Sequence, residues 1–136
     1  MKKKADVVVI GGGVNGCSVA YALAKKGIDV VLVEKNYLAS GATGACGAGI
    51  RQQWSTRENA LLAIQSVKIF EQLNRMLGQD IEFRQGGYLI AVHDAKEMEQ
   101  AEKNVAMQRS LGLTVDILQP EEITKVVSIL DVNGMG

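Results

Sequence analysis

The sequence predicts an α/β protein in which an amino-terminal parallel βαβ unit is followed by the beginning of an α+β region. Residues 7–35, VVVIGGGVNGCSVAYALAKKGIDVVLVEK, contain two short apolar runs separated by an Ala-rich segment. Beyond residue 55, amphipathic helical patterns alternate with short apolar stretches. Two parallel strands need a crossover connection, which is nearly always right-handed. We therefore expect the first helix to cover one face of its two strands.

The amino-terminal elements follow from their side chains. Val7–Ile10 consists of β-branched residues, which suits a short buried strand. Residues 14–26 are rich in Ala and apolar on nearly every face, so we expect a helix that is buried on several sides. Gly27 is its expected carboxyl-terminal cap. Residues 29–33 form the second strand, which ends at Glu34.

Three glycines between the first strand and the helix fit the spacing G-x-G-x-x-G. Gly11 permits a tight turn, Gly13 lets a diphosphate approach the backbone, and Gly16 allows the helix to pack against the strand. The backbone N–H groups near Val14 and Asn15, at the start of the helix, point toward such an anion. The alternative is a glycine-rich turn of an ordinary α/β protein.

An acid at the end of the second strand argues against that alternative. Glu34 follows Gly16 by 18 positions, close to the spacing of about 20 at which an acid binds an adenosine ribose. The combination predicts a site for the ADP part of a dinucleotide. NADP is disfavoured, because Glu34 would repel its 2′-phosphate.

The next segment favours FAD over NAD. Residues 38–54, LASGATGACGAGIRQQW, have four glycines among small residues, where a simple nicotinamide domain would have helix-forming residues. Such small residues let a backbone run close along a ligand. The alternative is a flexible loop.

A long helix follows. Ser55 and Glu58 have capping-box spacing, and the helical pattern runs from there to about Leu77. Gly78 ends it. The expected buried stripe consists of Leu62, Ile69, Phe70, Leu73 and Leu77.

The remaining elements predict a second domain. Residues 81–92 form a strand or hairpin edge, and residues 113–118 form a further strand. Between them, the acidic start at Asp94 opens a helix that reaches about Leu111, and Pro120 suits the first turn of a short helix. We expect residues 1–80 to belong to the domain with the dinucleotide site and residues 81–136 to begin a second domain.

Composition excludes several other classes. Lys plus Arg and Asp plus Glu each number 15, so the chain has no general field for nucleic acid. No apolar run suits a membrane span or a signal peptide. Two cysteines do not suggest a disulfide framework, so we expect a cytoplasmic protein. No His or Cys cluster has metal-ligand spacing, so we expect no metal site. His93 reads as a loop residue, Cys17 as core and Cys46 as a small buried thiol.

With these residues in view, the sequence resembles the FAD-dependent amine and amino-acid oxidoreductases of the D-amino-acid oxidase superfamily. Within that superfamily it is most similar to the group of the sarcosine oxidase β-subunit, glycine oxidase and dye-linked proline dehydrogenase. The resemblance rests on the glycine fingerprint at residues 6–34, the segment EKNYLASGATGACGAGIRQQ, and GGYLIA at residues 86–91. It implies that residues 1–80 are the amino-terminal part of an FAD-binding domain with a Rossmann-type βαβ unit. It also implies that residues 81–136 begin a substrate-binding domain, which is an antiparallel sheet with flanking helices.

The resemblance also assigns site residues. It places Lys35 near the adenosine and Arg51 at the flavin, as the basic residue of the site. Trp54 beside Arg51 could stack near the flavin, although a lone aromatic residue more often serves packing. Small residues of the glycine segment line the cofactor: Ala42 and Thr43 at the pyrophosphate, Gly47 after them, and Ala48, Gly49 and Ile50 along the isoalloxazine ring. Ala48 stands where some relatives carry another basic residue.

The implied activity is oxidation of the C–N bond of a small amine or amino acid to an imine, with FAD as cofactor. The resemblance also implies partner subunits of a hetero-oligomeric dehydrogenase. A flavin dehydrogenase of a hydroxy acid or glycerol phosphate, and a non-catalytic nucleotide-binding module, are the alternatives. Because the resemblance implies several hundred further residues after LDVNGMG, we expect the chain to be an inactive amino-terminal piece.

Overall fold

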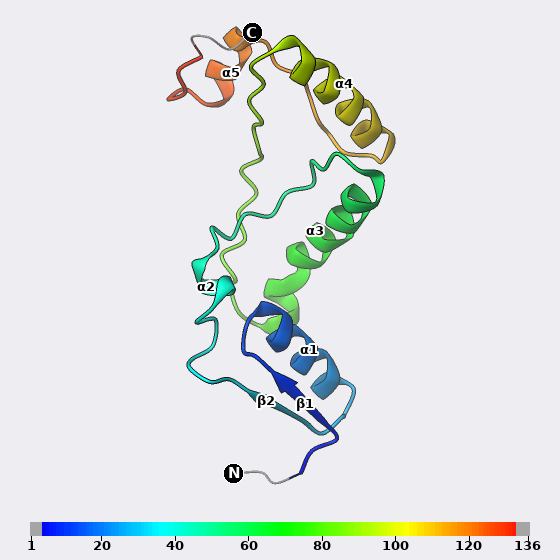
Figure 1. Cartoon of the computed structure of the whole chain (residues 1–136), viewed down its shortest axis with the longest axis vertical. Coiled ribbons are helices and arrows are strands. Elements are labelled where there is room, and N and C mark those ends of the chain that lie inside the picture. The colour runs from blue at the N-terminus through cyan, green and yellow to red at the C-terminus, as the bar shows by residue number, and fades with distance from the viewer. Residues whose placement is uncertain (1–3, 133–136) are drawn as a thin grey trace. The chain divides into compact units, whose positions relative to one another are not determined.

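The computed structural model in Figure 1 describes residues 4–132. The chain forms two compact units, Met1–Gly49 and Ile50–Gly136. These two units are groups of residues that contact one another, and they do not test where a cofactor-binding or substrate-binding domain ends. The predicted domains, residues 1–80 and 81–136, therefore stay a prediction.

The first unit contains the predicted βαβ arrangement. Strand β1 (Val7–Ile10) pairs in parallel with β2 (Val30–Val33), with Val7 opposite Val30. Helix α1 (Val14–Lys25) connects them, and the one-turn helix α2 (Ala42–Ala45) follows. Gly27 has a left-handed φ of 78° and donates its N–H to the carbonyl of Ala24, as expected of a cap. The parallel βαβ prediction is confirmed.

Helix α1 is less buried than its composition predicts. No residue of α1 is buried, and Val14 and Val19 are 55% and 50% exposed. The helix packs on a sheet of only two strands, which cannot surround it, so the prediction of burial on several sides is wrong for the described residues. The strand β1 is also less buried than predicted: Val7 and Val9 are partly covered, whereas Val8 and Ile10 are exposed.

Within residues 50–132, the described part of the second unit, the chain forms three helices. They are α3 (Arg57–Leu77), α4 (Ala95–Ser110) and α5 (Pro120–Val126). Helix α3 ends at Gly78 with a φ of 66°, as predicted. Its predicted capping box is wrong: Thr56 is the N-cap, and no side chain caps the helix there.

The buried stripe of α3 also differs from the prediction. Ala60 and Val67 are buried, whereas Leu62 and Ile69 are 68% and 55% exposed. Positions 60 and 67 lie on one face because they are two helical turns apart, and the larger side chains point elsewhere. Side-chain size was therefore a poor guide to which face of the helix is buried. Of the other predicted members, Phe70 and Leu73 are partly exposed and Leu77 is 41% exposed.

The starts of α4 and α5 follow the prediction. The Asp94 carboxylate accepts a 2.8 Å hydrogen bond from the Glu97 N–H, and the Glu97 carboxylate accepts one of 3.0 Å from His93 N–H. Pro120 is the first residue of α5, behind a capping box formed by Gln119 and Glu122. His93 is exposed and precedes the N-cap, as expected of a loop residue.

The strands predicted at residues 81–92 and 113–118 are not formed. The trace between α3 and α4 is drawn out (Figure 1), but neither segment joins a β-ladder within the described residues. Alternating side chains predict which residues share a face, whereas a strand also needs a neighbour for its backbone hydrogen bonds. The alternation of side chains can be seen in the sequence, but the neighbouring strand that a β-ladder needs cannot.

The core of the described residues is small. Ala60, Val67 and Ile123 are the buried apolar residues there, and all lie in the second unit. The chain exposes 10363 Å². Two separate compact bodies of these sizes would expose about 8,300 Å² in total. The chain therefore exposes more surface than two compact bodies would, and Ile10 in the first unit and Leu62 in the second are among its exposed apolar residues.

Candidate functional site

The turn between β1 and α1 can be built only with glycine at two positions. Gly11 has a φ of 103°, which other residues rarely adopt, and donates its N–H to the carbonyl of Val33 at 2.8 Å. At Gly16, a Cβ atom would overlap the carbonyl oxygen of Gly11 and contact Val9. The close approach of α1 to the end of β1, predicted from the glycine spacing, is therefore present.

A threonine from α2 lies at the amino terminus of α1. The N-cap Gly13 has no side chain to cap the helix, and the Val14 N–H instead donates a 3.0 Å hydrogen bond to Thr43 Oγ1. A Cβ atom at Gly13 would lie 3.1 Å from the same hydroxyl oxygen. The structure thus brings Gly13, Val14 and Thr43 together at a helix end that attracts anions.

The acid after β2 is held by two backbone donors. Glu34 accepts hydrogen bonds of 2.8 Å from the Gly12 N–H and 2.9 Å from the Asn36 N–H, one on each oxygen. The Gly12 amide, followed by that of Asn36, lowers the pKa of Glu34 below its ordinary value of 4.5, and Lys35 adds a smaller effect in the same direction. Glu34 is therefore an oriented carboxylate that is ionised at neutral pH, with lone pairs left for further donors.

The small-residue segment beyond β2 has unusual backbone geometry. Ala39 and Ala48 have φ values of 63° and 52°. Cys46 is exposed and donates its thiol hydrogen to the Thr43 carbonyl at 3.2 Å, so the prediction of a buried thiol is wrong. Cys17 is partly buried and is not among the core residues, so the prediction for it is wrong as well. The last residues of the first unit, Gly47, Ala48 and Gly49, are exposed, as are Asn15, Lys35 and Ala42.

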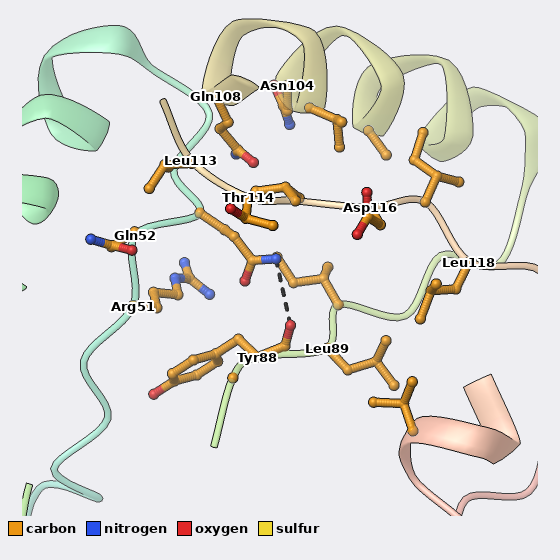
Figure 2. Close-up of a pocket in the computed structure, with 18 of the residues that line it drawn as sticks. Arg51, Gln52, Tyr88, Leu89, Asn104, Gln108, Leu113, Thr114, Asp116 and Leu118 are labelled. Atoms are coloured by element: carbon orange, nitrogen blue, oxygen red, sulfur yellow. Dashed lines mark hydrogen bonds between the residues drawn. The ribbon is translucent and has the colours of Figure 1, made fainter. Parts of the chain in front are cut away.

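Ile50 and Arg51 belong to the second unit and line a cavity of about 1010 Å³ there (Figure 2). The Arg51 guanidinium lies 4.6 Å from the centre of the Trp54 ring, a cation–π distance. The lining mixes apolar side chains with polar and charged ones, among them Arg84, Gln108 and Asp116.

Two residues of these sites were missed from the sequence. Gly12 is buried and supplies the N–H that holds Glu34. Gln108 is buried in α4 and donates a hydrogen bond to the carbonyl oxygen of Trp54, three positions after Arg51. A signal for Gln108 was available, since it continues the helical stripe of Ala101 and Val105.

Residues 4–132 contain no group of three or more His, Cys, Asp or Glu side chains that could hold a metal ion. In the same part of the chain, no helix is both long enough and apolar enough to cross a bilayer.

The glycine turn, the helix start and the acid after β2 together define a dinucleotide-binding βαβ unit. The chain belongs to the family described as FAD dependent oxidoreductase, which matches residues 6–135. FAD is the cofactor of this family.

Individual proteins are similar over almost the whole chain. FAD-dependent oxidoreductase domain-containing protein 1 of Xenopus laevis is 34% identical over 98% of this chain and 29% of its own length. Sarcosine oxidase subunit beta of an Arthrobacter species is 34% identical over 96% of this chain and 33% of its own. The crystal structure of L-proline dehydrogenase from P. horikoshii matches with a TM-score of 0.90 and 34% identity, over 99% of this chain and 36% of that one. This chain spans about a third of the length of these relatives.

Proposed function

We propose that the protein oxidises the C–N bond of a small amine or amino acid, with FAD as cofactor. The names of two relatives, a sarcosine oxidase subunit and an L-proline dehydrogenase, support this proposal. Sarcosine and proline are both amino acids whose nitrogen carries two carbon substituents. A secondary amino acid is therefore the substrate class that we propose first.

The first unit would hold the ADP part of FAD. The glycine turn and the start of α1 would bind the pyrophosphate, because their N–H groups and helix dipole favour an anion. Glu34 would accept from the ribose hydroxyls, with Lys35 beside the adenosine. The pyrophosphate residues of this proposal are Gly11, Gly13, Val14, Asn15, Gly16, Ala42 and Thr43. The residues that we propose to lie along the isoalloxazine ring of FAD are Gly47, Ala48, Gly49 and Ile50.

Arg51 is proposed as the cationic group at the reacting end of the site. When bound, FAD supplies the oxidising equivalent, and the substrate carbon next to nitrogen loses a hydride equivalent to give an imine. A guanidinium near the reacting atoms can stabilise negative charge that develops during this step. The cation–π contact with Trp54 supports this role, because it holds the guanidinium in one place.

The proposal is tested with the FAD-loaded natural gene product that contains this chain. Candidate substrates are added under anaerobic conditions, and reduction of the flavin is followed by its absorbance. Sarcosine and proline should bleach the flavin absorbance. Glycolate, lactate and glycerol 3-phosphate, which offer a C–O bond instead, should leave it unchanged. Bleaching by a hydroxy compound alone would show that the protein is the alternative kind of flavin dehydrogenase. Full FAD occupancy without reduction by either group would support a non-catalytic binding module.

Two further parts of the proposal concern assembly and location. The Arthrobacter relative is named as a subunit of sarcosine oxidase, which supports partner subunits for this protein as well. Co-purification of the tagged gene product from its own host would test this. A cytoplasmic location remains a prediction from cysteine content and charge.

A further inference from the structure

A buried glutamine of α4 holds the turn that carries Arg51. Gln108 is 4% exposed and is the buried polar residue of the described chain. Its side-chain Nε2 donates a 2.9 Å hydrogen bond to the carbonyl oxygen of Trp54, 54 positions earlier. A buried amide that reaches so far along the chain fixes one particular backbone atom.

Trp54 connects this hydrogen bond to Arg51. The indole Nε1–H donates to the Arg51 carbonyl at 3.2 Å, and the Arg51 guanidinium lies over the indole ring at 4.6 Å from its centre. The ring thus contacts both the backbone and the side chain of Arg51. A shift of the Trp54 backbone would move the surface on which the guanidinium rests.

Gln108 is itself fixed at the carboxyl end of α4. Its backbone carbonyl accepts hydrogen bonds from the N–H groups of Leu111 and Leu113, at 3.0 and 3.2 Å. Figure 2 shows its side chain descending from α4 toward the cavity, and Arg51, on the trace at the left, belongs to the same lining. The backbone of Gln108 is therefore held in place by the end of α4, and its side chain donates to Trp54 from this fixed position.

We propose that Gln108 is a positioning residue, which sets the place of the Arg51 guanidinium through Trp54. This inference rests on the proposed function, in which Arg51 assists the oxidation of an amine. Gln108 touches neither substrate nor cofactor in this scheme. It acts by keeping the turn at residues 51–54 at a fixed distance from α4.

The first variant is Gln108→Glu in the FAD-loaded natural gene product. It keeps the shape of the side chain but removes both N–H donors, so the Trp54 carbonyl loses its partner. The matched control is Gln100→Glu, the same exchange on an exposed face of α4. We expect Gln108→Glu to slow amine-dependent flavin reduction by about tenfold to a hundredfold, since a displacement of about 1 Å can have such an effect. Gln100→Glu should reduce at the wild-type rate.

A double-variant comparison separates positioning from general loss of structure. In an Arg51→Ala background, Gln108→Glu should cause little further slowing, because the group that it positions is already absent. Slowing by the same factor in both backgrounds would overturn the proposal. If Gln108→Glu does not fold, Gln108→Asn, which keeps an N–H donor on a shorter side chain, takes its place. An Asn variant equal to wild type in rate, and in the emission measurement below, would also overturn it.

A measurement without substrate tests the geometry separately from the proposed function. The emission of Trp54 is obtained by subtracting the spectrum of a Trp54→Phe variant from that of the unchanged apoprotein. Gln108→Glu and Arg51→Ala should both change this emission, and Gln100→Glu should not. An unchanged emission in Gln108→Glu would overturn the role of Gln108. Absence of reduction by any amine, with a changed emission, would instead contradict the proposed function and leave the geometry supported.

Discussion

The carboxylate of Glu34 accepts a 2.8 Å hydrogen bond from the backbone N–H of Gly12, so the acid after β2 is tied directly to the turn after β1. The Asn36 N–H occupies its other oxygen at 2.9 Å. Glu34 thus has two roles: its carboxylate can accept hydrogen bonds from a ligand, and it links the end of β2 to the turn after β1.

This double role makes Glu34→Gln more disruptive than a simple loss of charge. A glutamine has one oxygen for two backbone donors, so its NH₂ group must face one of them. We expect FAD affinity to fall by about tenfold, the order expected for a hydrogen bond to a charged group. Titration of the apo gene product with FAD measures this. Glu102→Gln, at an exposed site on α4, is the control, and equal affinities of the two variants would remove Glu34 from the ribose site.

The same carboxylate predicts a pH dependence. Because its backbone donors lower the pKa of Glu34 below its ordinary value of 4.5, the ionised form is stabilised by folding. This contribution is fully present above that ordinary value and is lost as the pH falls through the lowered pKa. The difference in unfolding free energy between wild type and Glu34→Gln should therefore be constant near neutrality and shrink below pH 4.5. A difference that grows on acidification would contradict the assignment.

Thr43 should stabilise α1 in the absence of cofactor. Its hydroxyl accepts from the Val14 N–H, as an N-cap side chain does, although it comes from another element. Thr43→Val keeps the shape and removes this acceptor, and should lower the unfolding free energy of the apoprotein by about 1 kcal/mol. Thr43→Ser keeps the hydroxyl and should lose much less. Thermal unfolding of the three proteins decides between these outcomes.

Gly16→Ala should prevent the close packing of α1 on β1. The added Cβ would overlap the Gly11 carbonyl oxygen, a backbone atom that cannot rotate away. We expect a loss of about 3 kcal/mol, the upper part of the range for overpacking, together with loss of FAD binding. Gly86→Ala adds a Cβ where no atom lies within 4 Å and serves as the control. Normal FAD binding by Gly16→Ala would mean that the turn adapts easily.

Local signals predicted the parts of the fold that depend on neighbouring residues. The βαβ unit, the start of α4 at Asp94 and the start of α5 at Pro120 each depend on a few adjacent positions, and each is present. The Gly16 contact was predictable for the same reason, because the glycine fingerprint describes one compact turn.

Features that depend on distant partners were not predictable. The segment at residues 81–92 has the alternation of a strand but no ladder in the described part of the chain. The buried face of α3 depends on what packs against the helix, and it contains Ala60 whereas Leu62 is exposed. The hydrogen bonds from Gly12 to Glu34 and from Gln108 to Trp54 join positions 22 and 54 residues apart, which no local pattern specifies.

The bond between Gly12 and Glu34 also bears on cofactor engineering. A designer who wished this protein to accept a 2′-phosphorylated nucleotide would replace the acid with a neutral or basic residue. That exchange would remove repulsion and, at the same time, release the Gly12 amide from the carboxylate that holds it. A successful redesign therefore needs a second substitution that supplies a new acceptor for Gly12, so that nucleotide preference changes without loosening the phosphate turn.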